Sequence, residues 1–201
     1  MTFSILSVCT GNICRSPVAE LLLAHALSPI AAVRVESAGT GALVGSGVPE
    51  QAQRLAAAGG VDASSHRARQ IDAGMIRGTD LVVAMSREHR RIIVESVPAA
   101  MRRAFTLREL ARIADALEPR LAQAVADAGA TTAEDGMRAG VALAAALRGT
   151  VQPPASPDEF DIVDPYRRSD ETYARSYAEL APAAARVASY LTAAAHAATS
   201  R

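Results

Sequence analysis

Tryptophan is absent from the sequence, and aromatic residues account for only 3% of its 201 positions. A core without many large aromatic side chains must be built mainly from alanine, valine, leucine and isoleucine. Hydrophobic residues nevertheless make up 50% of the chain, which is sufficient for a globular core. A chain of this length accommodates one well-packed domain more easily than two, so we expect a single domain over residues 1–201.

Neither sign of charge dominates, because 21 basic residues balance 21 acidic ones. No basic stripe or tail is present, so neither nucleic acid nor a membrane is an expected partner. The group of Arg87, Arg90 and Arg91 on one predicted helix is typical of a solvated helix face. The oligomeric state is left open by the sequence.

Long apolar runs are lacking as well. No stretch reaches the length of a transmembrane helix, and the N-terminus has no basic leader, apolar stretch and cleavage site of a secretory signal. Cysteine is scarce, with only Cys9 and Cys14 in the chain. These features predict a cytoplasmic protein whose two cysteines serve chemistry rather than structural cross-linking.

Short apolar runs alternate with helical patterns in the first half of the chain. Strands are predicted at 3–8, 33–37, 81–85 and 103–106, and helices at 17–27, 50–58 and 87–96. Ser16 is the predicted N-cap of the first helix, with Pro17 as its first residue. This order predicts an α/β fold with three layers: a central parallel sheet of about four strands with helices on both faces.

Residues 111–160 follow a different pattern. Two alanine-rich helical segments, 119–128 and 132–147, precede a proline-rich linker, and no catalytic pattern occurs among them. We interpret this region as an extra helical insertion. A closing helix is predicted from Asp170 to His196, with an apolar stripe that packs on the core.

The segment CTGNICRS, residues 9–16, carries the strongest chemical signal, because Cys9 and Arg15 are separated by five residues. A loop this short between a strand and a helix can aim successive backbone N–H groups at one point and so form an anion cradle. Gly11 permits a tight turn, and Asn12 tolerates a left-handed backbone. The predicted phosphate-binding residues are Thr10, Gly11, Asn12, Ile13, Cys14, Arg15 and Ser16.

The planar guanidinium of Arg15 can bind two phosphate oxygens at once, which lysine cannot do. The same positive surroundings favour a thiolate at Cys9, and a thiolate beside a bound phosphate monoester is a nucleophilic catalyst. Cys9 as an inert buried thiol and Arg15 as a structural ion pair are the alternatives. Their spacing argues against both.

At these residues the chain resembles the low-molecular-weight protein tyrosine phosphatase family, whose signature is similar to CTGNICRSP after an N-terminal strand. A second match is Asp164-Pro165-Tyr166. The resemblance implies hydrolysis of phosphotyrosine in protein substrates through a cysteinyl-phosphate intermediate, without cofactor or metal. It also implies that Asp164 protonates the leaving oxygen and then activates water. Alone, an Asp-Pro pair is more often only a turn.

The resemblance further implies that Ser16, Ser37 and His66 hydrogen-bond around Asn12 and brace its backbone. His66 could instead be an ordinary surface or capping histidine. His25, His89 and His196 have no motif context, and we interpret them as structural or solvated.

The walls of the substrate cleft are expected to be Ile13, Leu43, Val44 and Tyr166. Many family members have an aromatic residue where Leu43 and Val44 stand, so we expect phosphotyrosine to be preferred but weakly bound. Cys14 could capture oxidised Cys9 as a disulfide, or it could simply pack against the start of the helix.

Three other functions remain open. A related arsenate reductase shares the anion loop; its thioredoxin-coupled form needs a further cysteine, whereas a form coupled to small thiols does not. A phosphoarginine phosphatase tends to have threonine where Ile13 stands. A phosphate-binding module without turnover would need neither a nucleophile nor an acid.

Overall fold

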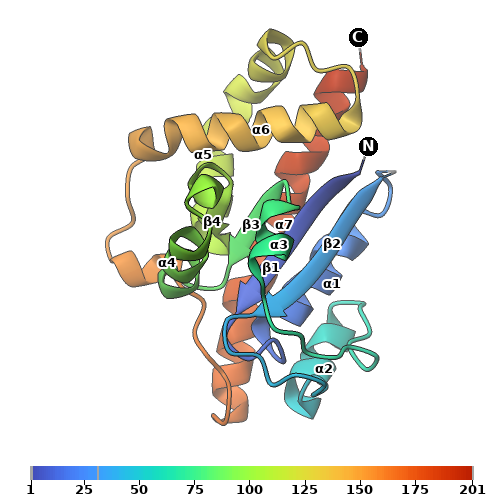
Figure 1. Cartoon of the computed structure of the whole chain (residues 1–201), viewed down its shortest axis with the longest axis vertical. Helices are drawn as coiled ribbons and strands as arrows, with labels where there is room; N and C mark the ends of the chain where they lie inside the picture. The colour runs from blue at the N-terminus through green and yellow to red at the C-terminus, as the bar shows by residue number, and fades with distance from the viewer. Residues whose placement is uncertain (1, 31, 201) are drawn as a thin grey trace.

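A computed structural model of the protein describes residues 2–30 and 32–200. Its centre is a four-stranded sheet in the order β2-β1-β3-β4, and every pairing is parallel (Figure 1). The strands are β1 (Phe3–Cys9), β2 (Val33–Gly39), β3 (Leu81–Ala84) and β4 (Ala104–Thr106). The predicted α/β fold with a four-stranded parallel sheet is therefore confirmed.

Side chains alternate between the two faces of the sheet along each strand, and each face packs against a core of its own. From β1, Phe3 and Ile5 join one core with α1 (Arg15–Leu27), α5 (Leu107–Asp127) and α7 (Asp170–Thr199). Leu6 and Val8 point to the opposite core with α3 (Ala73–Arg77) and α4 (Arg87–Ser96). This gives the three layers that the sequence predicts.

Helix α1 begins two residues earlier than predicted, at Arg15, with Cys14 as its N-cap. Ser16 is not the cap, because its hydroxyl accepts a hydrogen bond from Asn12 instead. Helix α2 (Glu50–Ala58) agrees with the prediction and lies against α1 and α7. Helix α7 agrees at its start, Asp170, and runs to Thr199.

Helix α5 differs from the prediction of a helix starting at Pro119. It begins after β4 with a capping box between Thr106 and Glu109, and it continues through Pro119. Leu117 and Leu121 are buried on either side of the proline. Burial of this continuous apolar stripe outweighs the single backbone hydrogen bond that proline removes.

Helix α6 (Ala133–Leu147) lies across α5 and α7 (Figure 1). Gly136 permits the close approach to α7, since an added Cβ would lie 2.3 Å from the carbonyl oxygen of Ala194. Arg138 binds Asp80 and the carbonyl of Thr2, which precede β3 and β1. Helix α6 therefore docks at the amino end of the strands, away from their carboxyl ends.

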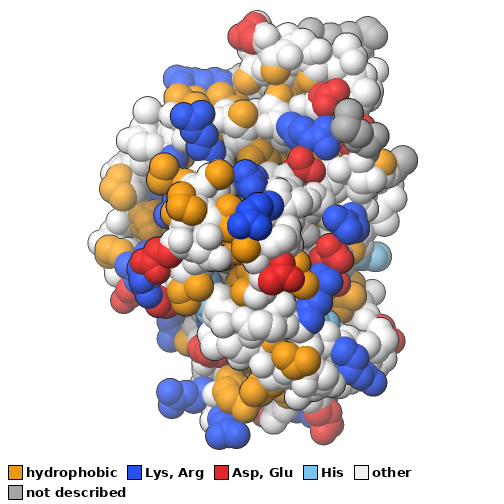
Figure 2. All heavy atoms as spheres, in the orientation of Figure 1, with side chains coloured by type: hydrophobic (Ala, Val, Ile, Leu, Met, Phe, Trp, Pro, Cys, Tyr) orange, Lys and Arg blue, Asp and Glu red, His pale blue; other side chains and the backbone are white. Residues whose placement is uncertain are grey.

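The described residues also include three 3₁₀ helices: η1 (Pro98–Arg102), η2 (Arg148–Thr150) and η3 (Pro157–Phe160). After η3 the chain returns to the carboxyl end of the sheet, where the N–H of Ile162 donates to the carbonyl of Met85. On the face drawn in Figure 2, basic and acidic side chains are interspersed. Within the described ranges, no helix is long and apolar enough to cross a membrane.

Candidate active site

The loop between β1 and α1 turns its carbonyl groups outward. The carbonyls of Cys9, Thr10 and Gly11 accept from the amides of Thr40, Gly41 and Leu43 at 2.9–3.0 Å. The N–H of the following residue points opposite to each carbonyl, because a trans peptide is planar. The amides of residues 10–12 are thus directed into the loop. Among the described residues, those of Gly11 and Asn12 donate to no acceptor.

Asn12 holds this loop from within. Its φ is 54°, a left-handed conformation, and its side chain is fully buried. Nδ2 donates to the hydroxyls of Ser16 and Ser37 at 2.9 and 2.8 Å, and Oδ1 accepts from the N–H of Arg69 at 2.9 Å. Nε2 of His66 lies 2.7 Å from the Asn12 carbonyl. Ser16, Ser37 and His66 therefore all contact the residue that the family resemblance assigned to them.

Two residues that the sequence did not single out support the same loop. Ser37 donates to Glu20 at 2.5 Å, and burial raises the pKa of that carboxyl. Gly39 passes so close to the loop that an added Cβ would lie 2.3 Å from the carbonyl oxygen of Thr10. Neither residue carries a sequence signal, because Glu20 lies within the helix predicted at 17–27 and Gly39 lies beyond the strand predicted at 33–37.

The two cysteines are free thiols in different surroundings. Sγ of Cys9 is buried and lies 3.0 Å from Oγ of Ser16. Ser16 accepts from Asn12, and its own proton can be donated to Sγ of Cys9 or to the carbonyl of Ala38, which is 3.5 Å away. Sγ of Cys14 lies 3.8 Å from the hydroxyl of Tyr173, and burial raises the pKa of Cys14 to about 11.

Arg15 connects the loop to the second motif. Its Nη1 donates to the carbonyl of Ile162 at 3.1 Å, and its Nη2 lies 2.6 Å from Oδ2 of Asp164. Nε of Arg15 is buried and has no hydrogen-bond partner within the described part of the chain. A buried donor without an acceptor, beside inward-facing amides, fits an oxyanion ligand.

A family model described as low molecular weight phosphotyrosine protein phosphatase matches residues 4–123, more than half of the chain. The chain belongs to this family. It is a phosphatase of the protein-tyrosine-phosphatase type. The matched residues include the phosphate loop, whereas Asp164 lies beyond them.

Individual relatives extend the likeness. The probable low molecular weight protein-tyrosine-phosphatase EpsP of Ralstonia solanacearum is 38% identical over 110 residues, which are 55% of this chain and 74% of EpsP. The tyrosine phosphatase Wzb from Escherichia coli K30, solved with sulphate, has a TM-score of 0.64 and 28% identity, covering 94% of this phosphatase and 98% of Wzb. The YwlE arginine phosphatase from Geobacillus stearothermophilus has a TM-score of 0.63 and 28% identity over 93% and 91%.

In this phosphatase the loop forms the floor of a cleft. The side chains that define it include Cys9, Ile13, Arg15, Leu43, Asp164 and Tyr166. Val44, the remaining expected wall residue, is 69% exposed and is not part of the lining. Arg167 stacks on the ring of Tyr166, with its guanidinium carbon 5.1 Å from the ring centre.

His89 is a further residue without a sequence signal, and it contacts the phosphate loop. Its Nε2 lies 2.8 Å from Oγ1 of Thr10, and its Nδ1 lies 2.8 Å from Oγ of Ser86. Burial, with a contribution from the positive charge of Arg15, lowers the pKa of His89 to about 4. A neutral imidazole therefore links the start of α4 to the residue after Cys9.

Proposed function

We propose that this phosphatase hydrolyses phosphotyrosine in protein substrates, with Cys9 as nucleophile, Arg15 as phosphate ligand and Asp164 as general acid. The observation that carries the proposal is the set of hydrogen-bond partners of the Arg15 guanidinium. Its buried Nε has no partner among the described residues, and Nη2 of the same guanidinium is paired with Asp164. The guanidinium of Arg15 thereby connects an anion site with the carboxyl group of Asp164, and both lie in the cleft that contains Cys9.

In the first half-reaction, Sγ of Cys9 attacks phosphorus and the bond between phosphorus and the tyrosine oxygen breaks. Asp164 gives its proton to that oxygen, so the product leaves as a neutral phenol. The loop amides and Arg15 bind the equatorial oxygens, where charge develops. The Ser16 hydroxyl, 3.0 Å from Sγ, stabilises the thiolate before the attack.

In the second half-reaction, water attacks the phosphorus of the cysteinyl phosphate. The carboxylate of Asp164 takes a proton from the water, the sulfur–phosphorus bond breaks, and inorganic phosphate and the Cys9 thiolate are released. The same carboxyl group thus acts first as acid and then as base. The residues assigned to this cycle require neither metal nor cofactor.

Phosphotyrosine is favoured over phosphoarginine by the apolar side chains in the cleft. Ile13 and Leu43 line it, and Tyr166 presents a ring that can pack against an aryl group. The aliphatic side chains of Ile13 and Leu43 offer a guanidinium no hydrogen-bond acceptor. Since Leu43 supplies less contact than an aromatic residue, we expect a raised KM with an ordinary kcat.

We also infer that residues 1–201 act as one domain, because β1, α1 and the segment after η3 all contribute to the cleft. A cytoplasmic location is consistent with a catalyst that depends on a reduced thiol. Redox sensitivity through Cys9 and Cys14 is the third part of the proposal, and Cys14 lines the same cleft.

The test is a comparison of phosphotyrosine, phosphoserine and phosphoarginine peptides, together with trapping of the intermediate. Acid quenching during turnover should leave a phosphoryl group on Cys9 that is visible by peptide mass. Cys9→Ser should abolish turnover but still bind vanadate, because a serine hydroxyl is not ionised at neutral pH. Arg15→Ala should lose both properties.

Substantial activity of Cys9→Ser would refute the mechanism. Equal efficiency on phosphoserine or phosphoarginine peptides would refute the substrate assignment alone. Thiol-dependent arsenate reduction is measured in parallel, and a rate exceeding that of phosphotyrosine hydrolysis would favour a reductase instead.

A further inference from the structure

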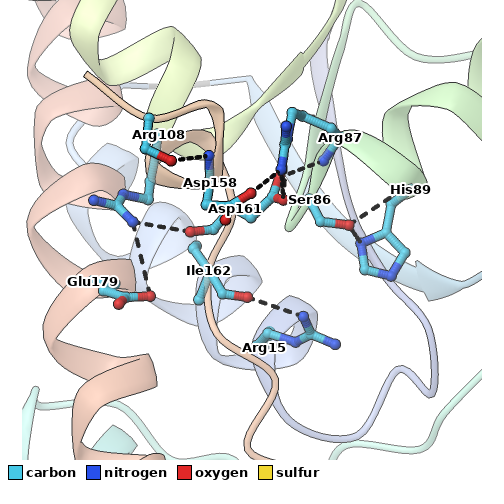
Figure 3. Close-up of polar contacts among 10 residues, drawn as sticks. Arg15, Ser86, Arg87, His89, Arg108, Asp158, Asp161, Ile162 and Glu179 are labelled. Atoms are coloured by element: carbon cyan, nitrogen blue, oxygen red, sulfur yellow. Dashed lines mark hydrogen bonds and ion pairs between the residues drawn. The ribbon is translucent and has the colours of Figure 1, made fainter. Parts of the chain in front are cut away.

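The residue two positions before Asp164 links the sheet to the phosphate loop. The N–H of Ile162 donates to the carbonyl of Met85, directly after β3, at 2.9 Å. The carbonyl of Ile162 accepts from Nη1 of Arg15 at 3.1 Å (Figure 3). The main chain at residue 162 therefore has a defined place relative to the guanidinium of Arg15.

The preceding residue is bound by the first turn of α4. Arg87 donates to both carboxylate oxygens of Asp161, from its backbone N–H at 2.7 Å and from Nε and Nη2 at 3.1 and 2.8 Å. Its Nη2 also donates to Asp158 in η3 at 2.6 Å (Figure 3). A guanidinium bound through two nitrogens fixes orientation as well as distance.

Helices α5 and α7 hold the segment from the other side. Nη1 of Arg108 donates to the carbonyl of Asp161 at 2.9 Å. Glu179 accepts from the N–H of Val163 at 2.9 Å and is itself paired with Arg175. The main chain is therefore bound at three consecutive residues, 161–163, directly before Asp164.

These contacts correct the interpretation of the arginines on α4. Arg91 is 56% exposed and fits a solvated face, but Arg87 binds the segment before Asp164 and Arg90 donates to the carbonyl of Ala104. Exposed ion pairs contribute little to folding, because water and salt screen them. Arg87 instead constrains the position of residues 158–161, which lead directly to Asp164, the proposed acid. A displacement of about 1 Å can slow catalysis by about a hundredfold.

We propose that Arg87 is a positioning residue: by binding Asp161 and Asp158, it holds Asp164 where its carboxyl group reaches the leaving oxygen. This rests on the proposed role of Asp164 as general acid. Arg87 is not among the residues that line the cleft and acts through the main chain of residues 161–163. The role also connects the insertion to catalysis, because η3 is the last element of residues 111–160.

The test compares Arg87→Ala with Arg91→Ala, a matched control on the same helix that pairs only with Glu88 and Glu95 among the described residues. The measured quantity is kcat/KM for phenyl phosphate, which has a poor leaving group, and for p-nitrophenyl phosphate, which has a good one. Arg87→Ala should lower kcat/KM about tenfold more for phenyl phosphate than for p-nitrophenyl phosphate. Vanadate inhibition should not become weaker, which also verifies that the cradle is folded. Arg91→Ala should match the wild type on both substrates.

A double variant separates this proposal from the one on which it rests. Because Arg87 acts through Asp164, Arg87→Ala combined with Asp164→Asn should be no slower than Asp164→Asn alone. Additive losses, equal losses on the two substrates, or weaker vanadate inhibition would overturn the positioning role. If Asp164→Asn alone shows no dependence on the leaving group, the acid assignment itself fails and the positioning role falls with it.

Discussion

Nη2 of Arg15 lies 2.6 Å from Oδ2 of Asp164, although the two residues come from opposite ends of the chain. Asp164 is 52% exposed at the cleft, whereas Arg15 is buried beneath it. A phosphate dianion bound in the loop must share this guanidinium with the carboxylate. The ion pair thus makes Asp164 a competitor of the phosphate as well as its proposed proton donor.

Asp164→Asn should therefore separate binding from catalysis. Removing the negative charge should strengthen inhibition by vanadate, because the guanidinium no longer has an anionic partner. Loss of the proton donor should lower kcat/KM by about 10²–10⁴-fold, most of all for poor leaving groups. Weaker vanadate inhibition in this variant would contradict the competition.

Gly39→Ala should damage the phosphate loop from outside. The new methyl group would lie 2.3 Å from the carbonyl oxygen of Thr10, so that the loop or the end of β2 must move. We expect a loss of about 1–3 kcal/mol in the free energy of unfolding, with a marked fall in kcat/KM. Gly47→Ala is the control, since its nearest neighbours would lie 3.9 Å away. Equal behaviour of the two variants would show that the approach of Gly39 is unimportant.

His89 should make stability depend on pH. Its pKa is lowered to about 4 in the folded protein, against about 6.5 in an unfolded chain. Between these values only the unfolded state binds the proton, so the free energy of unfolding should fall as pH decreases from about 6.5 to about 4. His89→Gln should remove this part of the slope in urea unfolding measured over that range. The exposed His25→Gln should retain it; unchanged slopes in His89→Gln would disprove the assignment.

Cys14 should protect oxidised Cys9, and more effectively at high pH. Burial raises the pKa of Cys14 to about 11, so it is a thiol at neutral pH, whereas the thiolate is the form that attacks sulfenic acid. After peroxide treatment followed by dithiol, recovery of the wild type should increase with pH and exceed that of Cys14→Ser. Equal recovery at all pH values would leave Cys14 with a packing role beside Tyr173.

A larger side chain should improve substrate binding at one of two neighbouring positions. Leu43→Trp should lower KM for aryl phosphates with little change in kcat, because Leu43 lines the cleft. Val44→Trp is the matched control, since Val44 is 69% exposed and outside the lining. If both variants lowered KM equally, the cleft would extend further than its lining indicates.

The form of the loop, a tight turn between a strand and a helix, could be predicted from the sequence because it is local. A buried run that breaks at Cys9, a glycine and an asparagine, and an arginine after five further residues all lie in one short segment. Strand alternation and turn residues likewise act over a few positions, so the parallel sheet and most helix bounds could be predicted. Helix α5 was misjudged because burial on both sides of Pro119 outweighs a local helix-breaking signal.

Only the tertiary structure decided which distant residues contact or support the phosphate loop. Gly39 and His89 contact it directly, and Glu20 supports it through Ser37. No local pattern marks these three residues, because their contacts form only after the sheet has brought separate strands and helices together. Arg87 belongs to the same class: its sequence context is that of a solvated helix, and its binding of Asp161 depends on where the chain returns after the insertion. Local preferences select elements and reactive groups, whereas contacts between distant segments are selected by the packing of the whole chain.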